Sequence, residues 1–137
     1  MRHDSRDARR TAGRTPMLTS RWIAGLESRS PGPLVAALTD FRMRRLLDLP
    51  GIVRHGRSLS RHWPELPGAV GMWLWADVPG RRVGSLSVWR SEEDLHGFVR
   101  LREHVAIMRA YRHRGTLRSR TWEVEHLDRA ELLRALR

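Results

Sequence analysis

Residues 83–108, VGSLSVWRSEEDLHGFVRLREHVAIM, decide the fold because their hydrophobic period changes partway along. Up to Trp89 the side chains alternate with a period of two, which is typical of a strand. Ser91 is a good helix N-cap, and the three acids after it suit a first helical turn. Beyond them, apolar residues recur every three or four positions, at Leu95, Phe98, Leu101, Val105 and Met108. The stretch therefore predicts a strand followed directly by a helix that runs to about Arg112.

A second strand precedes this one. The segments VGMWLWADV (70–78) and RRVGSLSVW (81–89) flank Pro79-Gly80, a dipeptide that favours a turn, so we predict a β-hairpin. On its first strand, Trp73 and Trp75 share one face, and apolar residues also occupy the other. We expect this strand to be covered on both sides.

The first half of the chain supplies three further predicted elements. PMLTSRWIAG (16–25) reads as a short strand. LVAALTDFRMRRLLDL (34–49) reads as an amphipathic helix, because its apolar residues are spaced by three and four. Leu49-Pro50-Gly51 would stop this helix, and GIVRHGRSLS (51–60) would then be extended.

GTLRSRTWEVE (115–125) predicts a last strand, and LDRAELLRALR (127–137) predicts a C-terminal helix. The order of strands and helices is that of a ferredoxin-like sandwich of the α+β class with an antiparallel sheet. The chain has 137 residues, the length of one domain. We assign residues 16–126 to this domain, and we predict a disordered basic arm at 1–15.

The composition limits the compartment and the chemistry. The sequence has no Cys, which rules out a disulfide framework and a thiolate metal site and favours a reducing, cytoplasmic compartment. The longest apolar run, AVGMWLWA (69–76), is too short to cross a bilayer, so we expect no membrane span.

The formal net charge is +11, and a strongly basic chain can bind a polyanion such as DNA or RNA. All 26 basic residues are Arg, and the chain also lacks Asn and Gln, a composition that coding bias alone can produce. No nucleic-acid-binding motif accompanies the charge. Nucleic-acid binding is therefore an alternative that the sequence does not favour.

The junction LSVWRSEEDLHGFVRLREHVAIM (86–108), with LPGIVRHG (49–56) before it, resembles the antibiotic biosynthesis monooxygenase-like group of dimeric α+β barrel proteins. The resemblance implies a ferredoxin-like subunit whose sheet packs against the sheet of a second copy. It also implies a pocket between each sheet and its own helices. The matching residues are Trp89-Arg90-Ser91 at the start of the helix, and Phe98, His104 and Met108 along it.

Members of this group include cofactor-free oxygenases of aromatic polyketides and haem-degrading enzymes, and this sequence departs from both. Haem-degrading members place a Trp where this chain has Phe98, and a haem-ligating His where it has Met108. Both kinds of enzyme also rely on an Asn, which this chain lacks. We therefore predict no cofactor, with haem as a disfavoured alternative.

His104 is the candidate catalytic residue. It lies near the side of its helix that carries Val105 and Met108, where it could reach the pocket and act as a base. The alternative is a half-buried histidine that is tied to a backbone carbonyl or to a neighbour such as Glu103. His96 precedes it by about 12 Å along the helix axis, too far to share an ion with it, so we predict no metal site.

Aromatic and arginine side chains are the candidate ligand contacts. Six of the nine aromatic residues (six Trp, two Phe, one Tyr) are Trp, and their flat rings can stack on a ligand or fill a core or subunit interface. Arg109 and Arg112 are the predicted anion-binding residues, with a solvated charged surface as the alternative. The predicted ligand-binding residues are Trp73, Trp75, Trp89, Phe98, Met108 and Tyr111.

These observations leave three functions open. The first is a homodimeric, monooxygenase-like enzyme of secondary metabolism that oxidises a small flat aromatic ligand, such as a polyketide, in a hydrophobic Trp-lined pocket without a cofactor. The ligand would supply the electrons, and His104 would accept a proton. The second function is a barrel that binds a ligand or partner without catalysis. The third is a basic module that binds nucleic acid.

Overall fold

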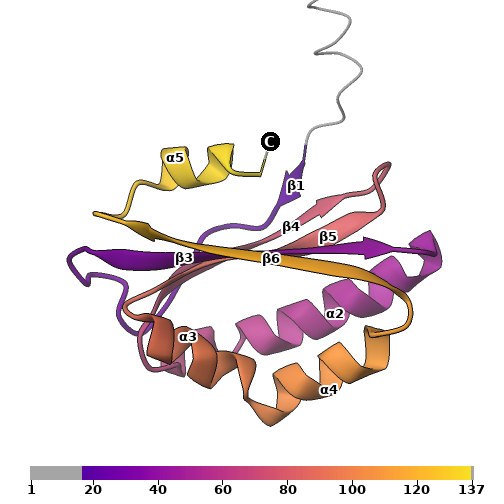
Figure 1. Cartoon of the computed structure of the whole chain (residues 1–137), viewed down its shortest axis with the longest axis horizontal. Helices are drawn as coiled ribbons and strands as arrows, with labels where there is room; N and C mark the ends of the chain where they lie inside the picture. Colours follow the sequence, from indigo (N-terminus) through magenta and orange to yellow (C-terminus); the bar gives the residue numbers. More distant parts are fainter. Residues whose placement is uncertain (1–16, 137) are drawn as a thin grey trace, which may run out of the picture.

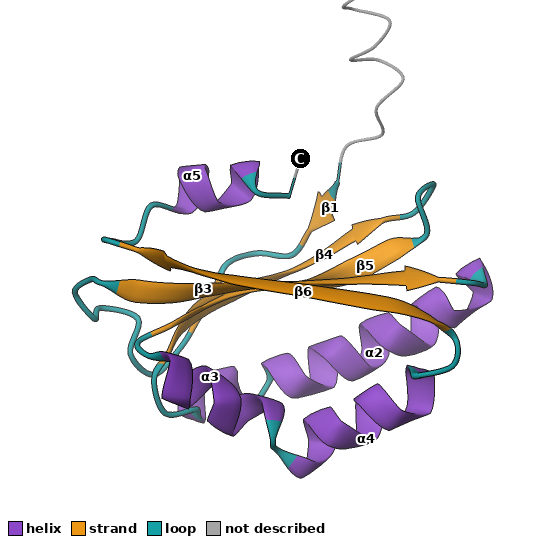
Figure 2. Ribbon diagram, in the orientation of Figure 1, coloured by secondary structure: helices purple, strands orange, loops and turns teal. Residues whose placement is uncertain are grey.

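The computed structural model describes residues 17–136, and the predicted basic arm at residues 1–15 lies outside them. An antiparallel sheet carries α-helices on both faces, as Figure 1 and Figure 2 show. The elements are β1 (Leu18–Thr19), β2 (Ile23–Ala24), β3 (Leu34–Met43), η1 (Leu46–Asp48), α2 (Leu49–Ser60), η2 (Trp63–Glu65), β4 (Ala69–Asp77), β5 (Arg82–Trp89), α3 (Glu92–Val99), α4 (Arg102–Tyr111), β6 (Gly115–Val124) and α5 (Arg129–Arg134).

The topology confirms the predicted ferredoxin-like α+β fold. The sheet runs β1-β4-β5-β3-β6, and β2 also pairs with β4. Its four long strands follow the chain order β3, α2, β4, β5, α3 with α4, and β6, which is the split β-α-β pattern. The predicted β-hairpin is confirmed, because β4 and β5 pair along their length and the N–H of Gly80 donates to the Asp77 carboxylate in the turn.

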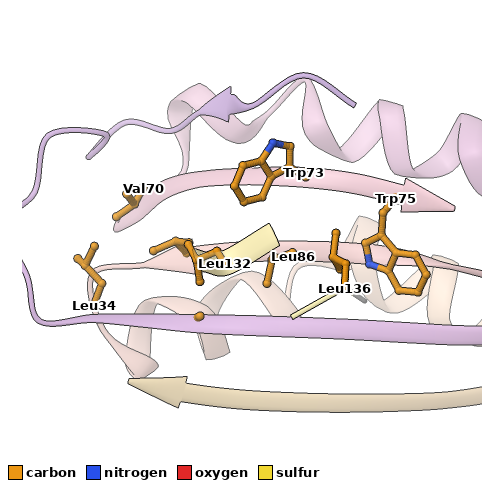
Figure 3. Close-up of a cluster of buried hydrophobic side chains, with 9 residues drawn as sticks. Leu34, Val70, Trp73, Trp75, Leu86, Leu132 and Leu136 are labelled. Atoms are coloured by element: carbon orange, nitrogen blue, oxygen red, sulfur yellow. The ribbon is translucent and has the colours of Figure 1, made fainter. Parts of the chain in front are cut away.

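Two apolar clusters lie on opposite faces of the sheet. Helices α2, α3 and α4 cover one face, which we call the helix face, and α5 lies on the other, the outer face (Figure 1). The helix-face cluster includes Trp63, Met72, Trp89 and Leu95. The outer-face cluster joins α5 to the sheet (Figure 3); its labelled members are Leu34, Val70, Trp73, Trp75, Leu86, Leu132 and Leu136. Strand β4 is thus covered on both sides, as the sequence predicts.

The predicted helix over residues 34–49 is wrong, because its first ten residues form strand β3. This strand lies in the interior of the sheet, between β5 and β6. Leu34 and Ala36 are buried on the outer face, and Ala37 is buried on the helix face. A strand that is covered on both faces loses the alternation of a half-exposed strand, so its apolar run also matches a helical spacing.

The extended segment predicted at residues 51–60 is also wrong, because Leu49–Ser60 form helix α2. Pro50 lies in the first turn of α2. A backbone N–H in the first turn has no acceptor within the helix, so the N–H that proline lacks is not needed there. Pro50 therefore begins this helix and does not end an earlier one. The apolar positions Ile52, Val53 and Leu59 then fall on one side of α2.

Two further predictions are confirmed only in part. The single helix expected over residues 92–112 forms as α3 and α4, which are separated at Leu101, where the backbone is extended (φ −59°, ψ 141°). Ser91 caps α3 as predicted, because its Oγ accepts from the N–H of Asp94 at 3.2 Å. The strand expected at residues 16–25 forms as β1 and β2, both antiparallel to β4. Within residues 17–136, no helix has the length and hydrophobicity needed to cross a membrane.

Candidate functional site

A pocket of about 350 Å³ lies on the helix face, between the sheet and helices α2 and α4. Small-molecule sites in proteins typically enclose about 300–1,000 Å³, so this pocket has room for a small ligand. Strands β4 and β5 form one wall, and residues of α2, α3, α4 and η2 form the other. Most of the lining is apolar, including Ile52, Val53, Leu74, Phe98 and Ile107.

The exposed lining residues mark the entrance. Among the described residues that line the pocket, only Leu18 and Thr19 of β1 and Arg57 of α2 are exposed. Trp63 and Met72, in contrast, are buried. The pocket therefore opens between β1 and α2, and its interior lies against the middle of β4 and β5.

The hydroxyl groups of the sheet wall are already hydrogen bonded within the protein. Ser85 Oγ lies 2.8 Å from Thr39 Oγ1, and Ser87 Oγ accepts a hydrogen bond from Trp89 Nε1 at 2.9 Å. Both serines line the pocket, because every second residue of β5 points to the helix face. Since these hydroxyls are paired, the sheet wall offers a ligand a mainly apolar surface.

Aromatic rings position His104 at the helix wall. The ring centroids of Trp63 and Trp89 are 4.7 Å apart, and Phe98 lies 5.6 Å from Trp63 and 5.2 Å from Trp89. Phe98 also packs edge-on against His104, with the ring centroids 5.0 Å apart. Edge-on and tilted contacts are favourable for aromatic rings. Phe98 therefore links the buried tryptophans to the imidazole and holds it beside the pocket.

His104 lines the pocket and is half-buried, and its Nδ1 is buried without a hydrogen-bond partner among the described residues. Burial lowers the pKa of His104 below its ordinary value of 6.5, and the backbone of Val99 opposes this effect more weakly. The hydrogen bond with the backbone of Val99 is the contact that the alternative interpretation expects, whereas Glu103, its other candidate partner, is exposed. The imidazole is therefore neutral at pH 7, the state in which it can accept a proton.

The lowered pKa of His104 predicts a pH-dependent stability. The unfolded chain binds a proton at this residue more readily than the folded protein does. The contribution of neutral His104 to the free energy of unfolding is therefore full above the unfolded-state pKa of about 6.5. It declines as the pH falls below that value and is lost below the folded-state pKa. We expect the free energy of unfolding to fall more on acidification for wild type than for His104→Gln. Urea titrations at several pH values measure both proteins, and identical pH dependences would contradict this.

Two of the six predicted ligand-binding residues, Trp75 and Phe98, line the pocket together with His104. The ring of Trp75, however, packs in the outer-face cluster with Trp73 (Figure 3). Trp73 is not among the lining residues. Trp89 is fully buried on the helix face, where it supports Ser87 and Phe98 from outside the pocket.

The remaining predicted residues lie at or beyond the outer part of α4. Met108 is 40% exposed and does not line the pocket. Tyr111 is half-buried and packs against His55, with the ring centroids 5.8 Å apart. Arg109 and Arg112 are exposed and also lie outside the pocket, so their anion-binding role stays a prediction.

Two lining residues that the sequence did not single out are Trp63 and Arg57. Trp63 is in η2, in a stretch between the predicted elements at residues 51–60 and 70–78, and Arg57 is in α2, where the sequence predicts an extended segment. The helical repeat of Ile52, Val53 and Leu59 after Pro50 was the signal that would have placed Arg57 on a pocket-facing helix.

The described residues offer little that could hold a metal or haem. Within residues 17–136, no three His, Asp or Glu side chains gather in a way that could hold a metal ion. Met108, where the resemblance implies a haem-ligating His in the haem-degrading members, lies outside the pocket. His104 is the one imidazole among the described lining residues, so it is the residue that would have to bind a haem iron there.

Known proteins resemble this chain in structure and not in sequence. No family model matches the sequence, and no curated protein matches it. Among solved structures it is similar to SnoaB, a cofactor-independent oxygenase from Streptomyces nogalater, with a TM-score of 0.55 and 13% identity over 70% of this chain and 97% of that chain. A Nitrosomonas europaea protein assigned as an antibiotic biosynthesis monooxygenase has a TM-score of 0.60 and 7% identity, over 73% of this chain and 96% of its own.

The haem-degrading enzyme LmHde from Listeria monocytogenes is similar as well, with a TM-score of 0.59 and 16% identity over 75% of this chain and 68% of that chain. These similarities confirm the resemblance to antibiotic biosynthesis monooxygenase-like proteins at the level of the fold. The chain thus shares its ferredoxin-like α+β fold with these three proteins.

Proposed function

We propose that this protein is a cofactor-independent, monooxygenase-like enzyme that oxidises a small flat aromatic ligand in the helix-face pocket. The observation that carries the proposal is the half-buried imidazole of His104, whose Nδ1 has no hydrogen-bond partner among the described residues, in a pocket that is otherwise mainly apolar. The fold, which is similar to that of a cofactor-independent oxygenase, supports the same reaction class. Aromatic polyketides are ligands with the required shape and polarity.

The reaction needs no resident redox group when the ligand itself is the reductant. Anthrone, a flat tricyclic ketone with an acidic methylene group, represents this ligand class. Loss of a proton to His104 leaves an electron-rich enolate, which gives its electrons to O₂. One oxygen atom enters the ring system and the other leaves as water, so anthrone and O₂ become anthraquinone and water. The apolar walls keep bulk water away from the enolate during the reaction.

The proposal includes a homodimer, in which the outer faces of two sheets meet as the resemblance implies. Strand β6 supports it, because residues 116–121 are all exposed and no other described strand pairs with its free edge. Helix α5 covers part of the outer face, so it would form part of the interface. Native mass spectrometry should show the mass of a dimer. The mass of a monomer would contradict the proposed homodimer but not the proposed function of the pocket. A cytoplasmic location stays a prediction.

The test is oxygen consumption by the purified full-length protein with anthrone and no added cofactor. We expect the protein to accelerate both oxygen uptake and anthraquinone formation, with one O₂ consumed for each quinone formed. The rate should be unchanged after dialysis against a chelator. If anthrone binds but is oxidised no faster than in buffer, the protein is instead a binding barrel without catalysis for this ligand class.

A further inference from the structure

We infer that the ligand of this pocket carries an anionic group, such as a carboxylate, which Arg57 binds at the entrance while the aromatic rings occupy the interior. The inference rests on the proposed function, because it concerns the ligand of the same pocket. It narrows the ligand class from flat aromatic compounds to flat aromatic acids.

The charge distribution in the pocket lining supports an anionic ligand. Arg57 and His104 are the only ionisable side chains among the described residues that line the pocket, and no carboxylate accompanies them. Burial keeps His104 neutral at pH 7, so Arg57 carries the one permanent charge of this lining. A cation beside an apolar cavity favours a ligand with one negative group and an apolar body.

The position of Arg57 also suits this role. It lies near the end of α2 and is one of three exposed lining residues, so it is at the entrance and not in the interior. Arg57 forms no salt bridge with another residue of the described part of the chain. Its guanidinium is therefore available to a carboxylate, which it can bind with two parallel hydrogen bonds. Thr19, on the opposite side of the entrance, adds a hydroxyl donor.

The interior shows why the anionic group must stay at the entrance. Ser85 and Ser87 already have hydrogen-bond partners there. Apart from His104, the unpaired side-chain donors of the described interior are the single indole N–H groups of Trp63 and Trp75. A carboxylate buried against these walls would lose its hydration and gain at most these neutral donors, which is less favourable than the charged guanidinium at the entrance. A flat acid therefore has one favourable orientation, with its rings toward His104 and its carboxylate toward Arg57. This orientation would also bring the same ring atoms to the imidazole in each binding event.

Two fluorescent probes of nearly the same shape test this directly. They are 8-anilinonaphthalene-1-sulfonate, which is anionic, and N-phenyl-1-naphthylamine, the same skeleton without the sulfonate. Binding of each probe is measured in 0.15 M salt. For the anionic probe, only the bound fraction that the neutral probe displaces is counted, because that fraction occupies the same pocket. Arg57→Met keeps the apolar stem and removes the charge. Arg54→Met, one turn earlier on α2 at an exposed position that does not line the pocket, is the matched control.

We expect Arg57→Met to weaken binding of the anionic probe about fivefold to tenfold, which is the range for a partly exposed, charge-assisted contact. Binding of the neutral probe should not change, Arg54→Met should affect neither probe, and Arg57→Lys should restore most of the loss. If Arg57→Met weakened the binding of both probes equally, or changed the binding of neither probe, the inference would be overturned. Failure of the wild-type protein to bind either probe would instead remove the proposed pocket itself.

Discussion

Replacing Trp89 with alanine is expected to lower the free energy of unfolding by about 3–5 kcal/mol, the usual cost of truncating a large buried aromatic residue. Trp89 is fully buried, at 0% exposure. Its ring contacts Trp63 and Phe98, and its Nε1 donates a hydrogen bond to Ser87. The substitution would leave a cavity beneath the pocket and would free the ring of Phe98, which holds His104.

Urea unfolding measures this loss, and Trp89→Phe is the control. Phenylalanine keeps a ring against Trp63 and Phe98 but cannot donate to Ser87, so it should cost clearly less than alanine. A loss below about 1 kcal/mol for Trp89→Ala would contradict the packing described for the helix face. A loss as large for phenylalanine as for alanine would show that the hydrogen bond, and not the ring stacking, stabilises this cluster.

Replacing His104 with alanine is expected to reduce the turnover of anthrone about hundredfold or more, the usual contribution of a general base. The fold should change little, because His104 is only half-buried and the variant loses one hydrogen bond, that with the backbone of Val99. The lowered pKa of His104 adds a pH signature. Protonation of the imidazole should lower wild-type turnover as the pH falls, with a midpoint below 6.5, and this fall in turnover should be absent from the variant.

Two further variants separate catalysis from packing. His104→Gln retains a polar side chain but cannot take up the proton, so it should be as inactive as alanine. If glutamine restored turnover, His104 would position the ligand and would not act as the base. His113→Ala replaces an exposed histidine beyond the end of α4 and should leave turnover unchanged.

The sequence predicted the second half of the fold better than the first half, for a physical reason. Residues 70–89 form a hairpin with one face to the helices and one to α5, and Ser91 has a strong helix-capping signal. These local signals agree with the tertiary environment. Strand β3 is covered on both faces, so its apolar run has no clear period, and only its pairing with β5 and β6 identifies it as a strand. Pro50 indicates a helix stop only if the segment before it is helical, and residues 34–43 are instead strand β3.

The same errors limited the prediction of the site. His104 and Phe98 lie on helices whose periodicity is visible in the sequence, and both line the pocket. Arg57 could not be placed, because it lies on α2, which the sequence suggested was extended. Trp73 and Trp89 were expected to line a pocket because of their size, but neither does. Residue type alone does not show which face of a sheet carries a cavity.

The proposal that this protein is a monooxygenase is tested most directly by isotope labelling. Anthrone is incubated with the protein under ¹⁸O₂, and the product is analysed by mass spectrometry. We expect anthraquinone in which one oxygen atom is ¹⁸O, formed faster with wild-type protein than with His104→Ala. Product formed at the same rate without protein, or oxygen incorporated from water and not from ¹⁸O₂, would contradict it.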